Sequence, residues 1–307
     1  MPQILDGKKV RDSILAEMKP RVERLAEAAR PPGLAVVLVG HDPGSEIYVR
    51  NKVKACQELG IYSEKITPPD TITTDELLAL IAALNARPEI DGILVQMPLP
   101  KQVDAHRVLL AIAPDKDVDG FHPFNVGNLV ANAPGPRPCT PAGIVEMLRR
   151  SEIKVAGKKA VIIGRSDIVG KPMALLLLHQ NATVTICHSK TANLADECRR
   201  ADILVAAMGR PAFVTAEFIG EGAVVIDVGI NRVTDPEQAA RILRGDSTRT
   251  GDFHRKGNLL VGDVHPLDTG NSSAFTPVPG GVGPLTIAML MVNAVELAER
   301  HILGRTG

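Results

Sequence analysis

The chain has 307 residues, 45% of them hydrophobic, and its 35 Lys and Arg balance its 35 Asp and Glu. This length is enough to bury a large core and favours two domains over one, whereas zero net charge and the absence of Trp argue against a nucleic-acid-binding surface. No apolar run reaches the roughly 18 residues of a membrane span and no apolar leader opens the chain, so we expect a cytoplasmic protein without membrane contact.

Strands alternate with helices through the first part of the chain. Helical patterns cover residues 8–29, 45–59, 74–86 and 103–112, and apolar strand patterns cover 34–39 and 92–96. Ser45 is expected to cap the second of these helices and Gly60 to end it. The alternation predicts a parallel α/β layer.

Lys52 is the least ordinary residue of the helix at 45–59. At about 100° per residue it lies in the middle of an apolar stripe that includes Val49, Cys56 and Leu59. A lysine at such a position either extends its ammonium to the edge of the stripe or is held in a cleft, where desolvation favours an amine that acts as a base. Tyr48, one turn earlier, either stacks on a flat ligand or packs in the core.

Two polar segments follow this helix. Gln96 ends a strand, where open α/β sheets bind ligands, and its amide is placed either to hydrogen-bond Lys52 or to pair with nearby backbone. Residues 115–125, DKDVDGFHPFN, bring three acids close together before Gly120. Such a run suits a solvated turn, a divalent-ion loop, or a tight loop that presents one carboxylate to a ligand. The histidines have no metal-binding spacing, and we expect no metal.

A Pro-rich connector at residues 132–141 precedes a βαβ pattern. Strands at 160–163 and 183–187 flank a loop from Gly164 to Gly170 and a helix at 173–178, which is the order of a dinucleotide half-site. The loop lacks the strict G-x-G-x-x-G spacing, so an ordinary βα turn that binds no nucleotide is the alternative.

The end of the second strand indicates which dinucleotide would bind. An NAD site places an acid there, whereas this chain has Cys187-His188-Ser189-Lys190. Together with Arg165 and Ser166 these donors favour NADP. The alternative is that His188 and Lys190 are only solvated loop residues.

The rest of the chain has two more buried-strand patterns, at 202–207 and 223–229, and a final helix at 284–302. Residues 233–258 are polar and charged, and we expect an irregular surface insertion there. The cysteines are far apart in the sequence and are expected to be buried thiols: Cys56, Cys139, Cys187 and Cys198.

Six segments, in order over nearly the whole chain, resemble the bifunctional methylenetetrahydrofolate dehydrogenase/methenyltetrahydrofolate cyclohydrolase family. The longest, TPVPGGVGPLT at 276–286, is specific by itself. The others are Tyr48-x-x-x-Lys52, VQMPLP at 95–100, KDVDG at 116–120, PCTPAG at 138–143 and GRSDIVGKPM at 164–173.

The resemblance implies an α/β protein with two domains. An N-terminal α/β catalytic domain that binds folate would cover residues 1–120, a Rossmann-like NADP-binding domain with a mostly parallel sheet would cover 121–283, and a C-terminal helix at 284–307 would pack back on the catalytic domain. The implied enzyme is a homodimer of one-carbon metabolism that serves purine biosynthesis. It would oxidise 5,10-methylenetetrahydrofolate with NADP and hydrolyse the methenyl product to 10-formyltetrahydrofolate.

The resemblance also implies residue roles. Lys52 would be the general acid/base, Gln96 would position it, Tyr48 would stack on the folate, and Asp119 would bond the pterin edge. The other residues expected to contact substrate are Val95, Met97, Pro277, Gly280 and Gly281. Those expected to contact NADP are Gly164, Arg165, Ser166, Ile168, Gly170, His188, Ser189 and Ile230.

The chain departs from the family pattern at two places. Asn128 stands where the family more often has Arg, and residues 233–258 replace a shorter hairpin. A short-chain dehydrogenase places its Tyr-x-x-x-Lys after the glycine loop, and a shikimate-type dehydrogenase is not expected to combine Lys52, Gln96 and Asp119. The remaining alternatives are a dehydrogenase without cyclohydrolase activity and a non-catalytic NADP-binding module.

Overall fold

The computed structural model describes residues 2–304 and divides into two compact units, each built on a parallel sheet. We call them the three-stranded unit and the six-stranded unit. The chain passes between them after Val10, Cys139 and Thr286. The predicted α/β fold with two domains and mostly parallel strands is confirmed.

The three-stranded unit has a sheet of order β3-β2-β4 with all strands parallel. Its strands are β2 (Gly33–Val37), β3 (Tyr62–Ile66) and β4 (Gly92–Val95). Its helices are α2 (Pro43–Leu59), α3 (Thr74–Asn85), α4 (Ala105–Ala111), α5 (Pro123–Val130) and most of α1 (Gly7–Ala28) and α11 (Gly283–Leu303).

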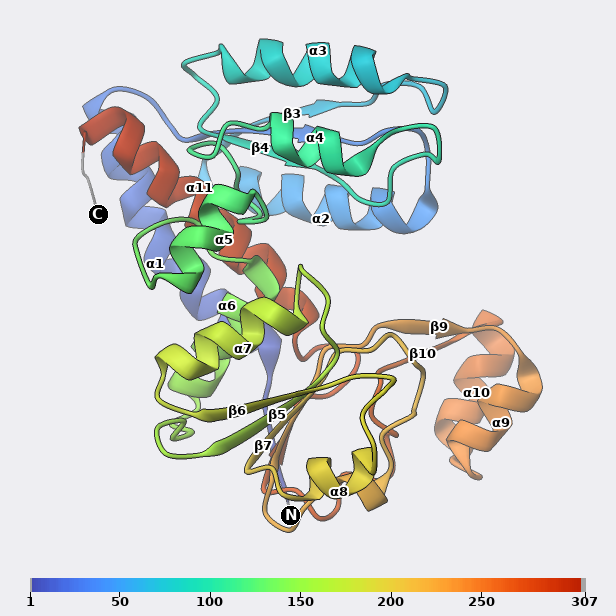
Figure 1. Cartoon of the computed structure of the whole chain (residues 1–307). Coiled ribbons are helices and arrows are strands. Elements are labelled where there is room, and N and C mark those ends of the chain that lie inside the picture. The colour runs from blue at the N-terminus through green and yellow to red at the C-terminus, as the bar shows by residue number, and fades with distance from the viewer. Residues whose placement is uncertain (1, 305–307) are drawn as a thin grey trace. The chain divides into compact units, whose positions relative to one another are not determined.

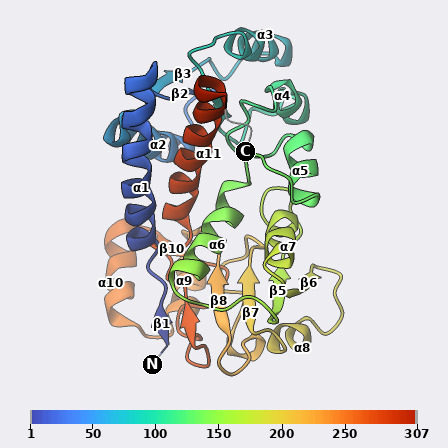
Figure 2. The ribbon, with the colours of Figure 1, turned by 90° about the vertical axis from the view of Figure 1, so that its left-hand side faces the viewer.

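Helices cover both faces of this sheet, as Figure 1 shows for α2 and α3. One hydrophobic cluster joins the face bearing Ala35 and Val95 to Leu77 of α3 and Val108 of α4. A second cluster joins the opposite face to α1, α2 and α11, and Figure 2 shows α1 and α11 side by side. Because β2 and β4 are buried on both faces, these two strands read as continuous apolar runs in the sequence.

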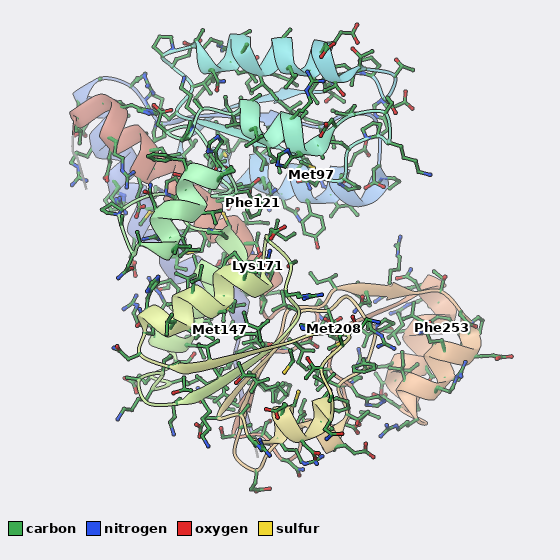
Figure 3. All side chains as sticks on the ribbon, viewed as in Figure 1. Met97, Phe121, Met147, Lys171, Met208 and Phe253 are labelled. Carbon is green, nitrogen blue, oxygen red and sulfur yellow. The ribbon has the colours of Figure 1, made fainter. Side chains whose placement is uncertain are left out.

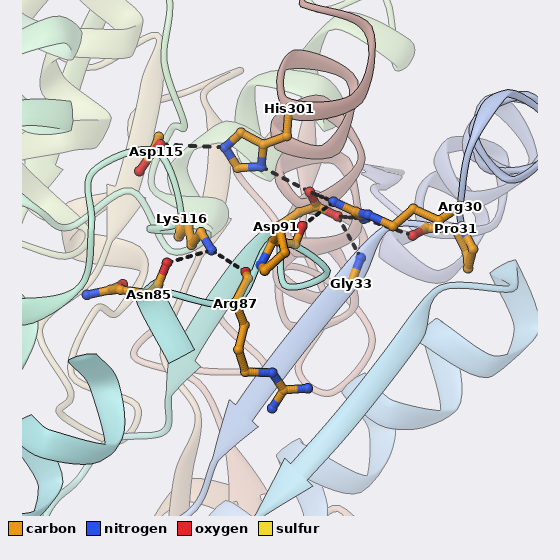
Figure 4. Close-up of polar contacts among 10 residues, drawn as sticks. Arg30, Pro31, Gly33, Asn85, Arg87, Asp91, Asp115, Lys116 and His301 are labelled. Atoms are coloured by element: carbon orange, nitrogen blue, oxygen red, sulfur yellow. Dashed lines mark hydrogen bonds and ion pairs between the residues drawn. The ribbon is translucent and has the colours of Figure 1, made fainter. Parts of the chain in front are cut away.

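A polar network fixes the start of β4 inside this unit (Figure 4). The fully buried Asp91 carboxylate accepts hydrogen bonds from Arg30 Nη1 at 2.6 Å, Arg30 Nη2 at 2.9 Å and the Gly33 N–H at 2.8 Å. His301 of α11 lies 3.0 Å away through Nδ1. The network joins the loop before β2, the start of β4 and the end of α11.

The six-stranded unit has the order β1-β11-β8-β7-β5-β6, and every pairing in it is parallel. Figure 2 shows β8, β7 and β5 side by side. The strands are β1 (Gln3–Ile4), β5 (Lys159–Ile163), β6 (Thr183–Cys187), β7 (Ile203–Ala206), β8 (Val224–Asp227) and β11 (Ala274–Phe275). The helices include α6 (Cys139–Arg150), α7 (Gly170–His179), α8 (Leu194–Arg199) and a 3-10 turn at Ala216–Phe218.

The expectation of an irregular insertion at residues 233–258 was wrong. Strands β9 (Asn231–Val233) and β10 (Leu259–Val261) pair antiparallel and enclose the helices α9 (Pro236–Leu243) and α10 (Ser247–Lys256). Phe253, labelled in Figure 3, packs in a small core with Ile242, Leu243 and Leu259. We call α9 and α10 the helical excursion.

Several local expectations also differ from the structure. The N-cap of α2 is Asp42, whose carboxylate accepts from the Ser45 N–H, rather than Ser45 itself, whereas Gly60 ends the helix at φ 80° as expected. Strand β3 and helices α5 and α6 were not expected, and α6 begins at Cys139, inside the Pro-rich segment. The boundaries between the two units lie after Val10, Cys139 and Thr286, whereas the predicted limits were residues 120 and 283. The first residues belong to the six-stranded unit because β1 pairs with β11.

None of the helices in residues 2–304 combines the length and the apolar character that crossing a membrane requires.

Candidate functional site

Lys52 lies where its stripe position predicted, in the interior of the three-stranded unit. It is 7% exposed on α2, and its Nζ donates a hydrogen bond to Gln96 Oε1 at 3.0 Å. Of the alternatives left open by the sequence, the structure shows the interior position of Lys52 and its hydrogen bond to Gln96. The Lys52 amine is therefore buried beside a fixed neutral acceptor.

Gln96 is held at both ends, and this fixes the direction of its amide. Its backbone N–H donates to Val37 O at 2.9 Å, which extends the ladder between β4 and β2 by one residue. Its Nε2 donates to Met97 O at 2.8 Å, so Oε1 is the end that accepts from Lys52. Figure 3 shows Met97 beside α2. Gln96 therefore acts as a rigid acceptor for the Lys52 amine.

The loop that follows α4 uses two of its charged residues for its own structure. Lys116 Nζ donates to the carbonyls of Asn85 and Arg87 at 2.9 and 2.7 Å, as Figure 4 shows. The Asp117 carboxylate accepts from the N–H groups of Gly120 and His122. Lys116 therefore ties the loop to the end of α3, and Asp117 is occupied within the loop.

Among the acids of this loop, Asp119 is the one whose carboxylate is available to a ligand. Within residues 2–304 its carboxylate accepts no hydrogen bond, and burial raises its pKa to about 6 while the Lys52 charge opposes that rise. Asp115, in contrast, faces His301 at 3.6 Å. Asp115 and Asp117 thus have partners, whereas the Asp119 carboxylate has none within residues 2–304, and the arrangement is that of a tight loop presenting one carboxylate.

Tyr48 lies one turn before Lys52 on α2 and is 41% exposed. Partial burial raises the pKa of its hydroxyl. The ring is therefore available for stacking rather than enclosed in the core. Val95 is different, because its side chain is 2% exposed and belongs to the cluster below α3 and α4, so it offers a ligand only its backbone.

The glycine-rich loop of the six-stranded unit accepts no side chain at either end. Gly164 has φ 128°, and a Cβ there would lie 2.1 Å from Ala207 O; a Cβ at Gly170 would lie 2.3 Å from Gly164 O. The Ser166 hydroxyl accepts from the N–H groups of Val169 and Gly170. The result is a tight turn into α7 whose backbone a ligand can approach closely.

Donors gather at the carboxyl ends of β5 and β6. The Gly164 N–H donates to Cys187 O at 2.9 Å, so Arg165 and His188 follow neighbouring strands at one edge. Arg165 and Ser189 are exposed there, and Ile168 is 50% exposed. His188 Nδ1 accepts from the Lys190 N–H at 3.1 Å, which shapes the turn. The adjacent ends of β5 and β6 therefore present exposed polar side chains at one edge of the sheet.

The segment 277–281 is held by the start of α1, in the same unit. The Gly7 N–H donates to Gly280 O at 2.9 Å, and the Gly281 N–H donates to Pro277 O at 2.8 Å. Gly280 has φ 107°, and a Cβ on Gly7 would lie 1.6 Å from Gly281 O. This close approach explains the glycines of the motif. Ile230 is 46% exposed nearby, within reach of Gly283.

A pair of buried carboxylates supports this unit and was missed in the sequence. The Asp263 carboxylate accepts hydrogen bonds from three consecutive backbone N–H groups, those of Met208, Gly209 and Arg210. The Asp227 carboxylate also accepts from three backbone N–H groups, those of Gly229, Asp263 and Val264. Burial raises the pKa of Asp227 to about 7. The available signal was a glycine near each acid, since a Cβ on Gly262 would lie 1.8 Å from Asp227 Oδ2.

The four cysteines are free and buried, as the sequence indicated. Cys139 lies closest to the polar groups above: its Sγ donates to Val118 O at 3.5 Å, and burial raises its pKa well above the ordinary value.

Comparison with known proteins agrees with both units. Residues 5–119 match the catalytic domain of tetrahydrofolate dehydrogenase/cyclohydrolase, and residues 138–302 match the NAD(P)-binding domain of the same family. The chain is 66% identical over 302 residues to the bifunctional protein FolD of Solibacter usitatus, covering 98% of this chain and 99% of that one. It is 53% identical to the bifunctional protein FolD of Moorella thermoacetica, covering 97% and 99%.

Solved structures agree with the fold. The bifunctional FolD enzyme of Campylobacter jejuni superposes with a TM-score of 0.88 at 42% identity, covering 98% of this chain and 99% of that one. The methylenetetrahydrofolate dehydrogenase-cyclohydrolase of Trypanosoma brucei, solved with NADP and an inhibitor, has a TM-score of 0.86 at 37% identity, covering 98% and 99%.

Proposed function

Because the chain belongs to the tetrahydrofolate dehydrogenase/cyclohydrolase family, we propose how its own residues divide the work of two reactions. The enzyme oxidises 5,10-methylenetetrahydrofolate with NADP and hydrolyses the 5,10-methenyl product to 10-formyltetrahydrofolate. The observation that carries the residue assignment is the buried hydrogen bond from Lys52 to Gln96. The folate-binding groups of the three-stranded unit are Lys52, Gln96, Tyr48 and Asp119, with Met97 and the Val95 backbone beside them.

The six-stranded unit fits NADP. Gly164 and Gly170 leave the backbone before α7 open to a pyrophosphate, and Arg165, Ser166 and Ser189 supply donors where a carboxylate would repel a 2′-phosphate. His188, Ile168 and Ile230 complete the proposed contacts. When bound, NADP supplies the hydride acceptor, and the protein contributes orientation.

In the hydrolysis, water adds its oxygen to the methenyl carbon and the bond from that carbon to N5 breaks. The Lys52 amine takes a proton from the attacking water and returns one to N5, with one proton released overall. Gln96 holds the amine by its fixed Oε1. Asp119 accepts hydrogen bonds from the pterin edge, and Tyr48 stacks on the flat ring.

The test compares Lys52→Met with Lys54→Met in two assays. Lys54 is an exposed neighbour on α2 that pairs with Glu58, so its loss controls for removal of a lysine. We expect Lys52→Met to lower methenyl hydrolysis by about 1000-fold, the range of a lost general acid/base, and to keep NADPH binding. Full hydrolysis by Lys52→Met would remove Lys52 from the role, and Lys54→Met should match the parent.

We propose that the enzyme works as a homodimer that pairs along β6. This strand is an edge of the six-stranded sheet, and an open edge is a surface on which a second chain pairs. Ile186 on β6 and Leu178 on the adjacent α7 are 40% and 53% exposed. Light scattering should give a dimer for the parent and a monomer for Ile186→Lys; a monomeric parent would refute the proposal.

We further propose a cytoplasmic role in supplying formyl groups for purine biosynthesis. The product of the second reaction, 10-formyltetrahydrofolate, supports this role because it carries the formyl group. A strain that lacks the gene for this protein should require purines for growth. Expression of the parent protein should remove that requirement, and expression of Lys52→Met should not. Growth without purines in the deletion strain would contradict it.

A further inference from the structure

A pocket of about 160 Å³ lies within the six-stranded unit, apart from the glycine-rich loop. Its wall combines Arg249 of α10, the end of β10 with the segment that follows it, and Phe275 to Val278, which begin at the last residue of β11. Of the residues assigned to substrate or NADP, the pocket shares Pro277 alone. The helical excursion thus supplies one side of the pocket.

Arg249 brings an uncompensated positive charge to this pocket. Its guanidinium makes one long contact, from Nη2 to Leu260 O at 3.5 Å, and no carboxylate within residues 2–304 forms an ion pair with it. Neighbouring arginines differ, since Arg244 pairs with Asp268 and Arg255 pairs with Asp252. A planar guanidinium without a partner is suited to a carboxylate, which it binds through two parallel hydrogen bonds.

His265 adds a neutral donor. It is 4% exposed, and its Nδ1 accepts from the Leu267 N–H at 3.3 Å, which places the ring proton on Nε2. Asp268 Oδ1 lies 3.6 Å from the same Nδ1, too far for a hydrogen bond, and Asp268 pairs with Arg244. In the part of the chain that the structure describes, Nε2 has no hydrogen-bond partner. Burial lowers the pKa of His265, so the ring is uncharged at neutral pH. The pocket therefore holds the Arg249 charge and a free N–H of His265.

The remaining wall selects among anions. Val264, Phe275 and Val278 are apolar, and they favour a ligand with a short hydrocarbon part. Asp227 also lines the pocket, and its carboxyl group disfavours a second negative charge on the ligand. The volume admits only a few non-hydrogen atoms. A dianion such as phosphate fits this charge balance poorly.

We propose that the pocket binds a small aliphatic monocarboxylate, with its oxygens on Arg249 and the His265 Nε2–H and its carbon chain on Val264, Phe275 and Val278. With so few atoms in contact, a dissociation constant in the millimolar range is expected.

The test measures the melting temperature of the full chain during titration with sodium propionate, with propionamide and sodium chloride at equal ionic strength as controls. We expect a saturable rise with propionate alone. Arg249→Met should weaken propionate binding at least about tenfold, and Arg249→Lys should weaken it less because one point charge remains. Arg255→Met, on the same helix, should behave as the parent.

The variants must bind NADPH as the parent does, which shows that they are folded. A response to propionate that is unchanged in both Arg249 variants would overturn the proposal, as would an equal response to propionamide. Tighter binding of inorganic phosphate than of propionate would overturn the assignment to a monocarboxylate. These outcomes do not depend on turnover, so they are independent of the roles of Lys52 and Gln96.

Discussion

At the scale of single residues, the fixed amide of Gln96 decides what Lys52 can do. Replacing Gln96 with Glu keeps the shape but sets a carboxylate 3.0 Å from the amine, where it favours the charged ammonium. A Lys52 amine that is already protonated cannot take a proton from water. We therefore expect methenyl hydrolysis to fall by about 100-fold at pH 7 and to recover partly at higher pH. The pH profile of single-turnover hydrolysis measures this.

The matched control for this change is Gln57→Glu, which adds the same charge to the exposed side of α2. It should leave the profile in place. If Gln96→Glu hydrolyses at the parent's rate, the amide does not tune the amine, and the hydrogen bond between them serves packing only.

Arg165 permits a second prediction at this scale. It is exposed at the end of β5, beside the end of β6, where a 2′-phosphate would lie. Removing a charge-assisted contact costs about 1.5–3 kcal/mol, so Arg165→Ala should weaken NADP binding by about 10- to 100-fold. NAD lacks that phosphate and should change by less than about threefold.

Fluorescence titration with NADPH and NADH gives both constants. Arg199→Ala is the control, because Arg199 is an exposed arginine of α8 whose ion pair with Asp196 is local. Equal losses of both cofactors in Arg165→Ala would show that the 2′-phosphate is recognised by other residues.

At the scale of elements, the helical excursion is held by a small core of its own. Phe253 is 8% exposed within it, and truncation of a buried Phe costs about 3 kcal/mol or more. Because so few apolar residues share this core, we expect Phe253→Ala to unfold α9 and α10 locally while the sheet stays intact. Limited proteolysis should then cut within residues 236–256, with NADPH binding preserved.

His254→Ala changes the exposed neighbour of Phe253 and should resist proteolysis like the parent. Global loss of NADPH binding in Phe253→Ala would mean that the excursion is a required part of the six-stranded unit rather than a local addition.

The same elements show where prediction from sequence ended. Strong apolar runs such as Leu34 to Val39 and amphipathic stripes such as that of α2 were readable, because burial on a sheet or helix imposes their period. α10 has Phe253 as its buried residue, so it shows no stripe, although Asp246 at its start is a capping residue. β3, with sequence YSEKI, is a half-exposed edge strand and carries too few apolar residues to stand out.

Some contacts of the candidate site could likewise be predicted from the sequence, and others could not. The contact between Lys52 and Gln96 was predictable because both are polar residues at positions that their elements turn inward. The contacts of Asp227 and Asp263 were not, because they join carboxylates to backbone N–H groups of distant loops, and backbone groups have no sequence signal. Glycines mark such contacts only after the structure shows what approaches them.

At the scale of the whole molecule, the two units can be followed separately. The chain has no Trp, and its Tyr residues, Tyr48 and Tyr62, both belong to the three-stranded unit. Intrinsic fluorescence therefore reports on that unit, and bound NADPH reports on the other. Proteins with two domains need not unfold in one step, so the two signals test whether this one does.

Replacing Asp91, in the three-stranded unit, tests whether the two units unfold separately. Burial raises its pKa, but the hydrogen bonds from Arg30, His301 and Gly33 outweigh burial and hold the pKa below its ordinary value. A lowered folded-state pKa means that the network stabilises the protein above the unfolded-state pKa of about 3.9, and that this contribution is lost as pH falls through the folded-state value. Removing the charge of a buried, paired carboxylate costs about 3 kcal/mol.

We therefore expect Asp91→Asn to lower the urea midpoint of tyrosine fluorescence at pH 7 and to leave the NADPH signal in place if the units unfold independently. The difference between parent and variant should begin to shrink below about pH 5, where the unfolded chain starts to take up the proton, and should go on shrinking as pH falls through the lowered folded-state pKa of Asp91. Asp115→Asn, whose side chain is 70% exposed and lies 3.6 Å from His301 Nε2, should change the midpoint little. A difference between parent and Asp91→Asn that stays constant with pH would show that the network acts through packing rather than charge, and a joint shift of both signals would show that the two units unfold as one.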